Sequence, residues 1–207
     1  MRTDFLTVTG LGAAAVASML ALAPVARADS GPPPRTRGVI TAMTDTSVTL
    51  KTRFGGPVTL KITPDTGYVG ATKASLAEAK QGRFIGVAAN PGPGGTLVAR
   101  EVTIFPEAMR GAGEGHYGWD LGRQGSMTNG TIGTVSGSSG RTMTVDYKGG
   151  KTSMTVPADA PVVDLEAGDK SLLKAGAHVV AFGPKSADGS VDAKRIVVGV
   201  DGAVPPM

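Results

Sequence analysis

One spacing relates the two halves of this sequence, and it constrains the fold more than any other feature. Similar residues recur 94 positions apart in turns, in strand-like segments and at the end of a short helical segment. They include Gly56 and Gly150, Leu60 and Met154, Asp65 and Asp159, Gly82 and Gly176, and Val102 and Ile196. A constant displacement over such different kinds of position predicts an internal duplication, in which each copy is one structural unit.

Alternating residues predict several β-strands in each copy. Apolar and polar residues alternate along Val58-Thr59-Leu60-Lys61-Ile62, which is the pattern of a strand with one buried face. Gly, Pro, Asn and Asp separate the segments of this kind and favour turns between them. In the first copy, strands are expected over 38–43, 47–53, 58–62, 84–89 and 97–105.

A short helix is expected between the third and fourth of these strands. Ser75 and Glu78 have the spacing of a capping box, so the helix should begin at Ser75, run to about Gln81 and end at Gly82. The resulting order, β-β-β-α-β-β, is that of the OB-fold, a small five-stranded barrel. The sequence therefore predicts a mainly β protein made of two tandem OB-like barrels.

The two copies also resemble an uncharacterised family of bacterial exported domains. In that family a Gly-x-Ile/Val strand opens the domain, a Gly-x-x-Val strand follows the helix, and an Ala-Lys/Arg-x-Val/Ile strand closes it. The first copy has Gly38-Val39-Ile40, Gly82-Arg83-Phe84-Ile85 and Ala99-Arg100-Glu101-Val102, and the second has Gly130-Thr131-Ile132, Gly176-Ala177-His178-Val179 and Ala193-Lys194-Arg195-Ile196. The resemblance implies two copies of a domain of unknown function.

The first 28 residues have the pattern of a cleaved signal peptide. Arg2 provides a positive start, Leu11 to Ala23 is an apolar run, and Ala26-Arg27-Ala28 fits a cleavage site. Arg2-Thr3-Asp4-Phe5-Leu6 resembles a twin-arginine signal with Thr3 in place of the second Arg, which leaves both export routes open. We expect a periplasmic or secreted protein. The apolar run is shorter than the roughly 20 residues that a membrane helix needs, so no stable membrane insertion is expected after cleavage.

Composition narrows the possible partners and the chemistry. The chain has no Cys, which excludes disulfides, thiolate metal sites and a Cys nucleophile. Its formal net charge is only +4, and Lys and Arg are scattered, so no nucleic-acid partner is expected. The predicted segments are a signal peptide (1–28), a Pro-rich leader (29–36), a first OB-like repeat (37–106), a Gly-rich connector (107–129), a second OB-like repeat (130–200) and a C-terminal tail (201–207).

The connector is the one substantial segment without a second copy, and it is the richest in functional groups. It holds the only Trp of the chain and one of its two His residues. Its many glycines would let the backbone fold closely around a bound group. The candidate ligand-binding residues are Glu114, His116, Tyr117, Trp119 and Asp120.

Two interpretations of the connector use its aromatic rings. A ligand site would use Tyr117 and Trp119 as stacking faces, with Arg110 or Arg123 as a clamp for a sugar or an anionic group. A packing role would place the same rings between the barrels and satisfy the nearby carboxylates through turns or these arginines. A pocket beside Trp119 favours the ligand site, and complete burial favours the packing role.

A third interpretation is a metal carrier or sensor. His116 would supply a nitrogen ligand, Glu114 or Asp120 an oxygen, and Met127 or Met109 a thioether suited to copper(I). No repeated His or Met spacing supports such a site. Enzymatic activity is not expected, since the chain has no G-x-S-x-G motif and no Cys. We expect a non-catalytic binding or structural accessory protein without a cofactor, acting on an unidentified small ligand or protein partner.

Overall fold

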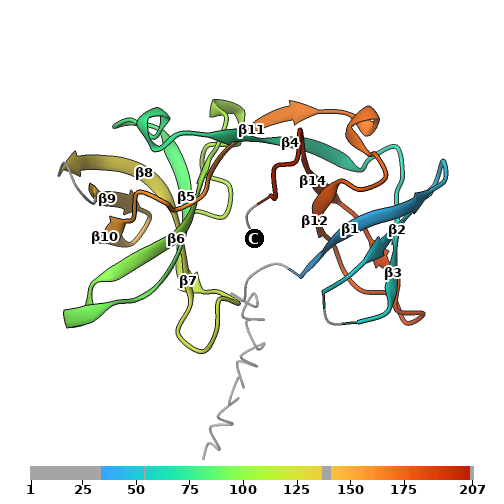
Figure 1. The fold of residues 1–207 in the computed structure, drawn as a ribbon, viewed down its shortest axis with the longest axis horizontal. Helices are drawn as coiled ribbons and strands as arrows, with labels where there is room; N and C mark the ends of the chain where they lie inside the picture. The colour runs from blue at the N-terminus through green and yellow to red at the C-terminus, as the bar shows by residue number, and fades with distance from the viewer. Residues whose placement is uncertain (1–33, 54, 137–140, 206–207) are drawn as a thin grey trace, which may run out of the picture. The chain divides into compact units, whose positions relative to one another are not determined.

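The computed structural model describes residues 34–53, 55–136 and 141–205 (Figure 1). The expected signal peptide, most of the leader and the last two residues of the tail lie outside the described residues. The described chain is mainly β. Its strands are β1 (Arg35–Met43), β2 (Ser47–Lys51), β3 (Pro57–Lys61), β4 (Gly67–Ala74), β5 (Phe84–Pro91), β6 (Leu97–Ile104), β7 (Gly115–Gly118), β8 (Ser126–Ser136), β9 (Arg141–Tyr147), β10 (Gly150–Val156), β11 (Val162–Gly168), β12 (His178–Phe182), β13 (Val191–Asp192) and β14 (Arg195–Gly199).

The middle of the chain closes a β-barrel, here called the central barrel, from β5, β6, β8, β9 and β10. These strands lie in the order β10-β9-β8-β5-β6, and the ring is closed where β10 pairs in parallel with the start of β6. Alternate side chains point inward, because side-chain direction reverses at each position of a strand. The buried core includes Ile85, Val87, Val102, Ile104, Ile132, Met143, Val145, Met154 and Val156.

The two ends of the described chain contribute a second set of strands, here called the terminal group: β1, β2, β3, β12, β13 and β14. β1 pairs with β12 and β2, β3 pairs with β2 and β13, and β12 pairs with β14. The core of this set is separate from that of the central barrel. Its buried residues include Ile40, Val48, Leu50, Leu60, Ile62, Val179, Ala181, Val191, Ile196 and Val198.

This strand pairing differs from the expectation of one barrel for each sequence copy. β1 to β3 and β5 to β6 all lie in the range of the first copy, yet they belong to different strand sets. The cause is β4, a strand that sequence analysis did not predict. It pairs with β14 of the terminal group and antiparallel with β11, which in turn pairs with β6 of the central barrel. β4 and β11 therefore carry the chain between the two sets (Figure 1).

The expected helix is wrong in type and length. The five predicted strands of the first copy are present as β1, β2, β3, β5 and β6, but Ser75 to Gln81 contains only the 3₁₀ turn η1 (Leu76–Glu78). The capping interaction itself forms, since the backbone N–H of Ser75 donates to the Glu78 carboxylate at 2.8 Å. The chain enters the turn directly from β4 and leaves it for β5, which leaves too few residues for a stable α-helix. Three further 3₁₀ turns are η2 (Pro93–Gly95), η3 (Glu107–Met109) and η4 (Lys170–Leu172).

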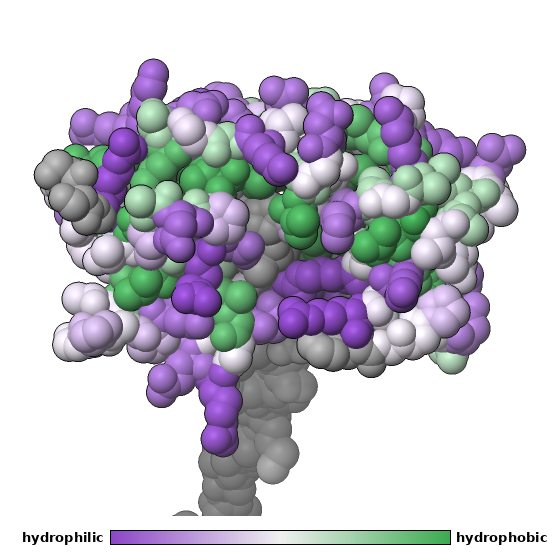
Figure 2. Space-filling model, in the orientation of Figure 1, coloured by the Kyte–Doolittle hydropathy of each residue, from purple (hydrophilic) through white to green (hydrophobic). Residues whose placement is uncertain are grey.

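Exposed hydrophobic residues are scattered over the surface. Hydrophilic side chains surround several small hydrophobic areas on the face seen in Figure 2. The large apolar residues that stand out most among the described positions are Met43, Val135 and Val204, from three separate segments. A search of the described residues for an α-helix long and apolar enough to cross a bilayer found none.

Candidate functional site

Part of the predicted connector forms a β-hairpin. β7 pairs antiparallel with the first residues of β8, so β8 begins at Ser126, earlier than the predicted start of the second repeat. His116 lies opposite Thr128, and Tyr117 lies opposite Met127. Because directly paired residues share a face and neighbours alternate, Tyr117 and Met127 lie on one face and His116 lies on the other.

The His116 face of the hairpin serves the structure. The His116 Nδ1 atom lies 2.8 Å from the Thr128 hydroxyl, and its ring stacks on Tyr147 with centroids 6.0 Å apart. Glu114 accepts a hydrogen bond of 3.0 Å from the backbone N–H of Lys148. These two candidate ligand-binding residues attach the hairpin to the turn between β9 and β10.

The predicted metal ligands are not brought together. His116 and Met127 occupy opposite faces of the hairpin, and Glu114 is engaged with the turn after β9. Within the described ranges, no group of three or more His, Asp or Glu side chains is placed to hold a metal ion.

The Tyr117 face of the hairpin borders a cavity of about 330 Å³. Tyr117, Trp119 and Met127 form part of its wall, and the rings of Tyr117 and Trp119 meet edge to face with centroids 5.9 Å apart. Phe182 and Val197 of the terminal group also line it. The wall is largely apolar and combines connector residues with residues from strands far away in the sequence.

Two buried polar atoms on residues of this wall have no hydrogen-bond partner within the described structure. They are the indole Nε1 of Trp119 and the amide Oδ1 of Asn129, and each residue is only 7% exposed. The amide nitrogen of Asn129, in contrast, has hydrogen-bond partners. Its Nδ2 atom donates to the Ala112 carbonyl at 3.1 Å and contacts the Tyr117 hydroxyl at 3.4 Å. Two residues of the cavity wall thus carry a buried donor and a buried acceptor without a partner in the described structure.

A glycine makes room for this arrangement. A Cβ atom at Gly86 would lie 2.6 Å from Asn129 Oδ1 and 3.0 Å from the Phe105 ring, closer than real side chains tolerate. Any larger residue would have to push the Asn129 amide or the Phe105 ring. Gly86 therefore preserves the shape of the cavity wall.

Asp120 lies outside this wall and connects the hairpin to β1. It pairs with Arg35 at 2.8 Å and with Arg37 at 2.6 Å, while the Arg35 guanidinium lies 3.5 Å from the centroid of the Trp119 ring. Burial raises the pKa of Asp120, but hydrogen bonds from Arg37 and Arg35 outweigh it, and the pKa falls to about 2. The expected partners were Arg110 and Arg123, but Arg110 pairs instead with Glu107.

Sequence analysis missed Arg35 and Arg37 as site residues. Arg35 falls in the predicted Pro-rich leader, but β1 begins there, and Arg35 pairs across the sheet with Phe182. Its side chain is only 8% exposed because it packs on Trp119 and binds Asp120. The prolines that precede Arg35 in the sequence did not predict this long-range contact.

Glu101 is a further buried acid beside these charges. It belongs to β6 and lines the same surface hollow as Arg37 and Asp120. Burial raises its pKa to about 7, opposed by the positive charge of Arg37 and reinforced by the negative charge of Asp120. Its Oε1 atom is buried without a partner among the described residues. Strand alternation alone did not distinguish it from a surface glutamate.

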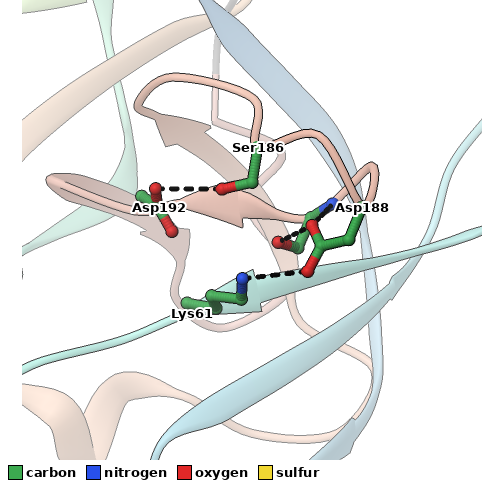
Figure 3. Close-up of polar contacts among 5 residues, drawn as sticks. Lys61, Ser186, Asp188 and Asp192 are labelled. Atoms are coloured by element: carbon green, nitrogen blue, oxygen red, sulfur yellow. Dashed lines mark hydrogen bonds and ion pairs between the residues drawn. The ribbon is translucent and has the colours of Figure 1, made fainter.

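A separate polar cluster joins β3 to the loop before β13 (Figure 3). The Lys61 ammonium lies 3.0 Å from the Asp188 carboxylate, and the Ser186 hydroxyl donates to Asp192 at 3.0 Å. Hydrogen bonds from Ser190 and from Lys61 lower the pKa of Asp188. Every polar group here has a partner within the cluster, so the cluster is a turn-stabilising contact.

These features define a mainly β protein whose most ligand-like site is a small apolar cavity beside its single Trp. Residues 37–103 match a family model described as a domain of unknown function (DUF5666), and the family is uncharacterised. The matched segment runs from β1 into β6, so its strands are divided between the terminal group and the central barrel. No curated protein and no solved structure matches the chain significantly.

Proposed function

We propose that this protein is a non-catalytic binding protein that holds a small ligand in the cavity beside Tyr117 and Trp119. The observation that carries the proposal is the pair of unpartnered buried atoms, Trp119 Nε1 and Asn129 Oδ1, on an otherwise apolar wall. Leaving a buried polar group without a partner costs about 1–3 kcal/mol. A ligand that accepts from the indole and donates to the amide would remove both costs.

The size of the cavity supports a small molecule as the ligand. Its volume of about 330 Å³ lies at the lower end of the range for ligand pockets, roughly 300–1,000 Å³. Apolar walls with a few convergent polar groups are typical of such pockets. The burial of Trp119 fits the packing role as well, and one residue can serve both purposes.

We also infer that the chain is a tandem duplication whose two OB-like barrels have exchanged halves. The pairing of β4 with β11 supports this, because Gly70 lies opposite Glu166 and Thr72 opposite Asp164. A displacement of 94 residues converts one of these pairs into the other, as a two-fold relation between copies would. The ligand cavity would then belong to both copies together, and the signal-like first 28 residues support export of the whole unit.

Binding can be tested with the neutral fluorescent probe phenylnaphthylamine, whose N–H suits Asn129 Oδ1. Since Trp119 is the only Trp, energy transfer from Trp to the probe reports binding near this residue. We expect saturable binding of one probe with loss of Trp119 emission. The substitution Gly86→Ala should weaken binding of the probe at least tenfold, because it displaces the Asn129 amide.

The matched control for this test is Gly118→Ala. A Cβ atom at Gly118 meets nothing within 4 Å, so probe binding should not change. Circular dichroism would establish that both variants keep the strand content of the wild type. Absence of saturable binding in the wild type, or equal binding in folded Gly86→Ala, would contradict the proposal.

A further inference from the structure

Two positively charged side chains lie at the exposed side of the cavity. Lys194 and Arg195 both line it and both are exposed to solvent, whereas Trp119 and Asn129 are buried. Arg195 lies directly opposite Phe182 on the neighbouring strand. Because paired residues share a face of the sheet, the Arg195 side chain lies on the same side as the Phe182 ring that helps form the wall.

These cations have no carboxylate partner among the residues that the structure describes. All of the residues that line the cavity are apolar, neutral polar or basic, and none is Asp or Glu. Several other cations of the described chain do pair with a carboxylate, as Arg35 and Arg37 do with Asp120 and as Lys61 does with Asp188. The cavity therefore combines an apolar interior with uncompensated positive charge at its opening.

We propose that the cavity selects an amphipathic anion. This inference rests on the proposed function and names its ligand class: a compact apolar body with one anionic group, such as a carboxylate or sulfonate. The apolar body occupies the wall of Tyr117, Phe182 and Val197, and the anionic group is held by Lys194 and Arg195. A neutral group at the buried end accepts from Trp119 Nε1 and donates to Asn129 Oδ1.

The volume of the cavity and the exposure of its cations limit the size of the ligand and the strength of its attraction. A volume of about 330 Å³ accommodates a single small ring system or a short acyl chain, and a lipid with two long chains would not fit. The cations are exposed, so their attraction to an anion is screened by salt. We expect them to favour an anion over its neutral counterpart by about tenfold at low ionic strength, which corresponds to a modest electrostatic contribution.

Two probes with the same ring system test the inference. Phenylnaphthylamine is neutral, and anilinonaphthalene sulfonate carries one sulfonate on the same aromatic body. The wild type should bind the sulfonate about tenfold more tightly at low salt, and added salt should weaken only the sulfonate. In the double variant Lys194→Gln/Arg195→Gln, the affinity for the sulfonate should fall about tenfold, to that for phenylnaphthylamine, so that the preference is lost.

A control variant removes equal charge elsewhere. Lys80→Gln/Lys174→Gln changes two exposed lysines that do not line the cavity, so it should keep the preference for the sulfonate. Lys194→Glu supplies a second test, because reversing the charge at the opening should make the neutral probe the tighter ligand.

The outcomes separate this inference from the proposed function. If neither probe binds the wild type, the proposed function fails. If both probes bind with equal affinity, or if Lys194→Gln/Arg195→Gln keeps the preference for the sulfonate, the binding function stands and the anion selectivity is overturned.

Discussion

At the scale of single residues, Glu101 is a carboxylic acid whose pKa is strongly raised by its surroundings. Its pKa rises from 4.5 to about 7 in the folded protein, chiefly because it is buried. The folded protein therefore holds this proton more tightly than the unfolded chain does between about pH 4.5 and 7. Raising the pH through this window removes the proton and lowers the free energy of unfolding.

The substitution Glu101→Gln should remove this pH dependence. We expect the wild type to lose about 2 kcal/mol of unfolding free energy between pH 5 and 8, given about 1.4 kcal/mol for each pKa unit and the partial exposure of the side chain. Urea unfolding at several pH values would measure this loss of unfolding free energy. Glu166→Gln, at an exposed position, is the control and should follow the wild type. Parallel curves for the wild type and Glu101→Gln would contradict the account.

Asp120 has the opposite pH dependence, because its pKa is lowered to about 2 from 3.8. Its stabilising effect is present above pH 3.8 and is lost as the pH falls through 2. Asp120→Asn should reduce the free energy of unfolding by about 1 kcal/mol at neutral pH, since the exposure of Asp120 weakens its pairing with buried Arg35. Asp159→Asn, in an exposed turn, should have little effect in the same urea measurement. An equal loss in both variants would show that the pairing is not the cause.

At the scale of secondary-structure elements, the glycines that open the two proposed copies, Gly38 and Gly130, have a physical explanation. A Cβ atom at Gly38 or Gly130 would lie closer than 3.0 Å to the backbone carbonyl of Lys51 or Asp146 on the paired strand. Both glycines precede an irregularity in strand register, between Ile40 and Ala42 in β1 and between Ile132 and Thr134 in β8. The recurrent Gly-x-Ile/Val pattern thus permits a close approach of two backbones.

Substituting either of these glycines should therefore be destabilising. We expect Gly38→Ala and Gly130→Ala each to cost about 1–3 kcal/mol, because the strands must separate locally to admit the methyl group. Gly118→Ala, which has open space around it, should change stability by less than about 0.5 kcal/mol. Thermal and urea unfolding would compare the three variants, and similar losses in all of them would refute the explanation.

Strand periodicity predicted five strands of the first copy but not the elements that place the site. β4 contains Gly67 and Gly70 and alternates poorly, because its successive residues 69–71 are all buried, so that neither face of the strand is consistently exposed. β7 is only four residues long and begins and ends with Gly, which conceals its alternation. Tyr117 and Trp119 could be selected by residue type alone, whereas Gly86 lay in a predicted strand and Asn129 was the last residue of the predicted connector.

At the scale of the whole molecule, the two cores make the halves of the chain interdependent, because each core contains strands from both halves. Contacts such as β1 with β12 and β5 with β8 join residues that are far apart in the sequence. Sequence similarity between the two proposed copies could not reveal the proposed exchange of halves, because exchanged and unexchanged barrels would bury the same residue types. Only the route of the chain through β4 and β11 distinguishes them.

A chain divided at the connector should show this interdependence. We expect a fragment of residues 34–106 to lack cooperative unfolding as a monomer, since it lacks β12 to β14 and leaves the apolar faces of β1 to β3 uncovered. Mixing it with residues 107–205 should restore the circular dichroism and the cooperative transition of the intact protein. A monomeric fragment that unfolds cooperatively alone would show that each copy closes its own barrel.

The central claim, a ligand in the cavity beside Trp119, is tested most directly by the indole N–H resonance of this residue. Because Trp119 is the only Trp, a proton–nitrogen correlation spectrum contains a single indole signal. Titration with phenylnaphthylamine should shift that signal saturably and slow its exchange with water, because the bound probe places an aromatic ring beside the indole and keeps water away from its N–H. An indole signal that keeps its position and exchange rate when the probe is saturating would contradict the account.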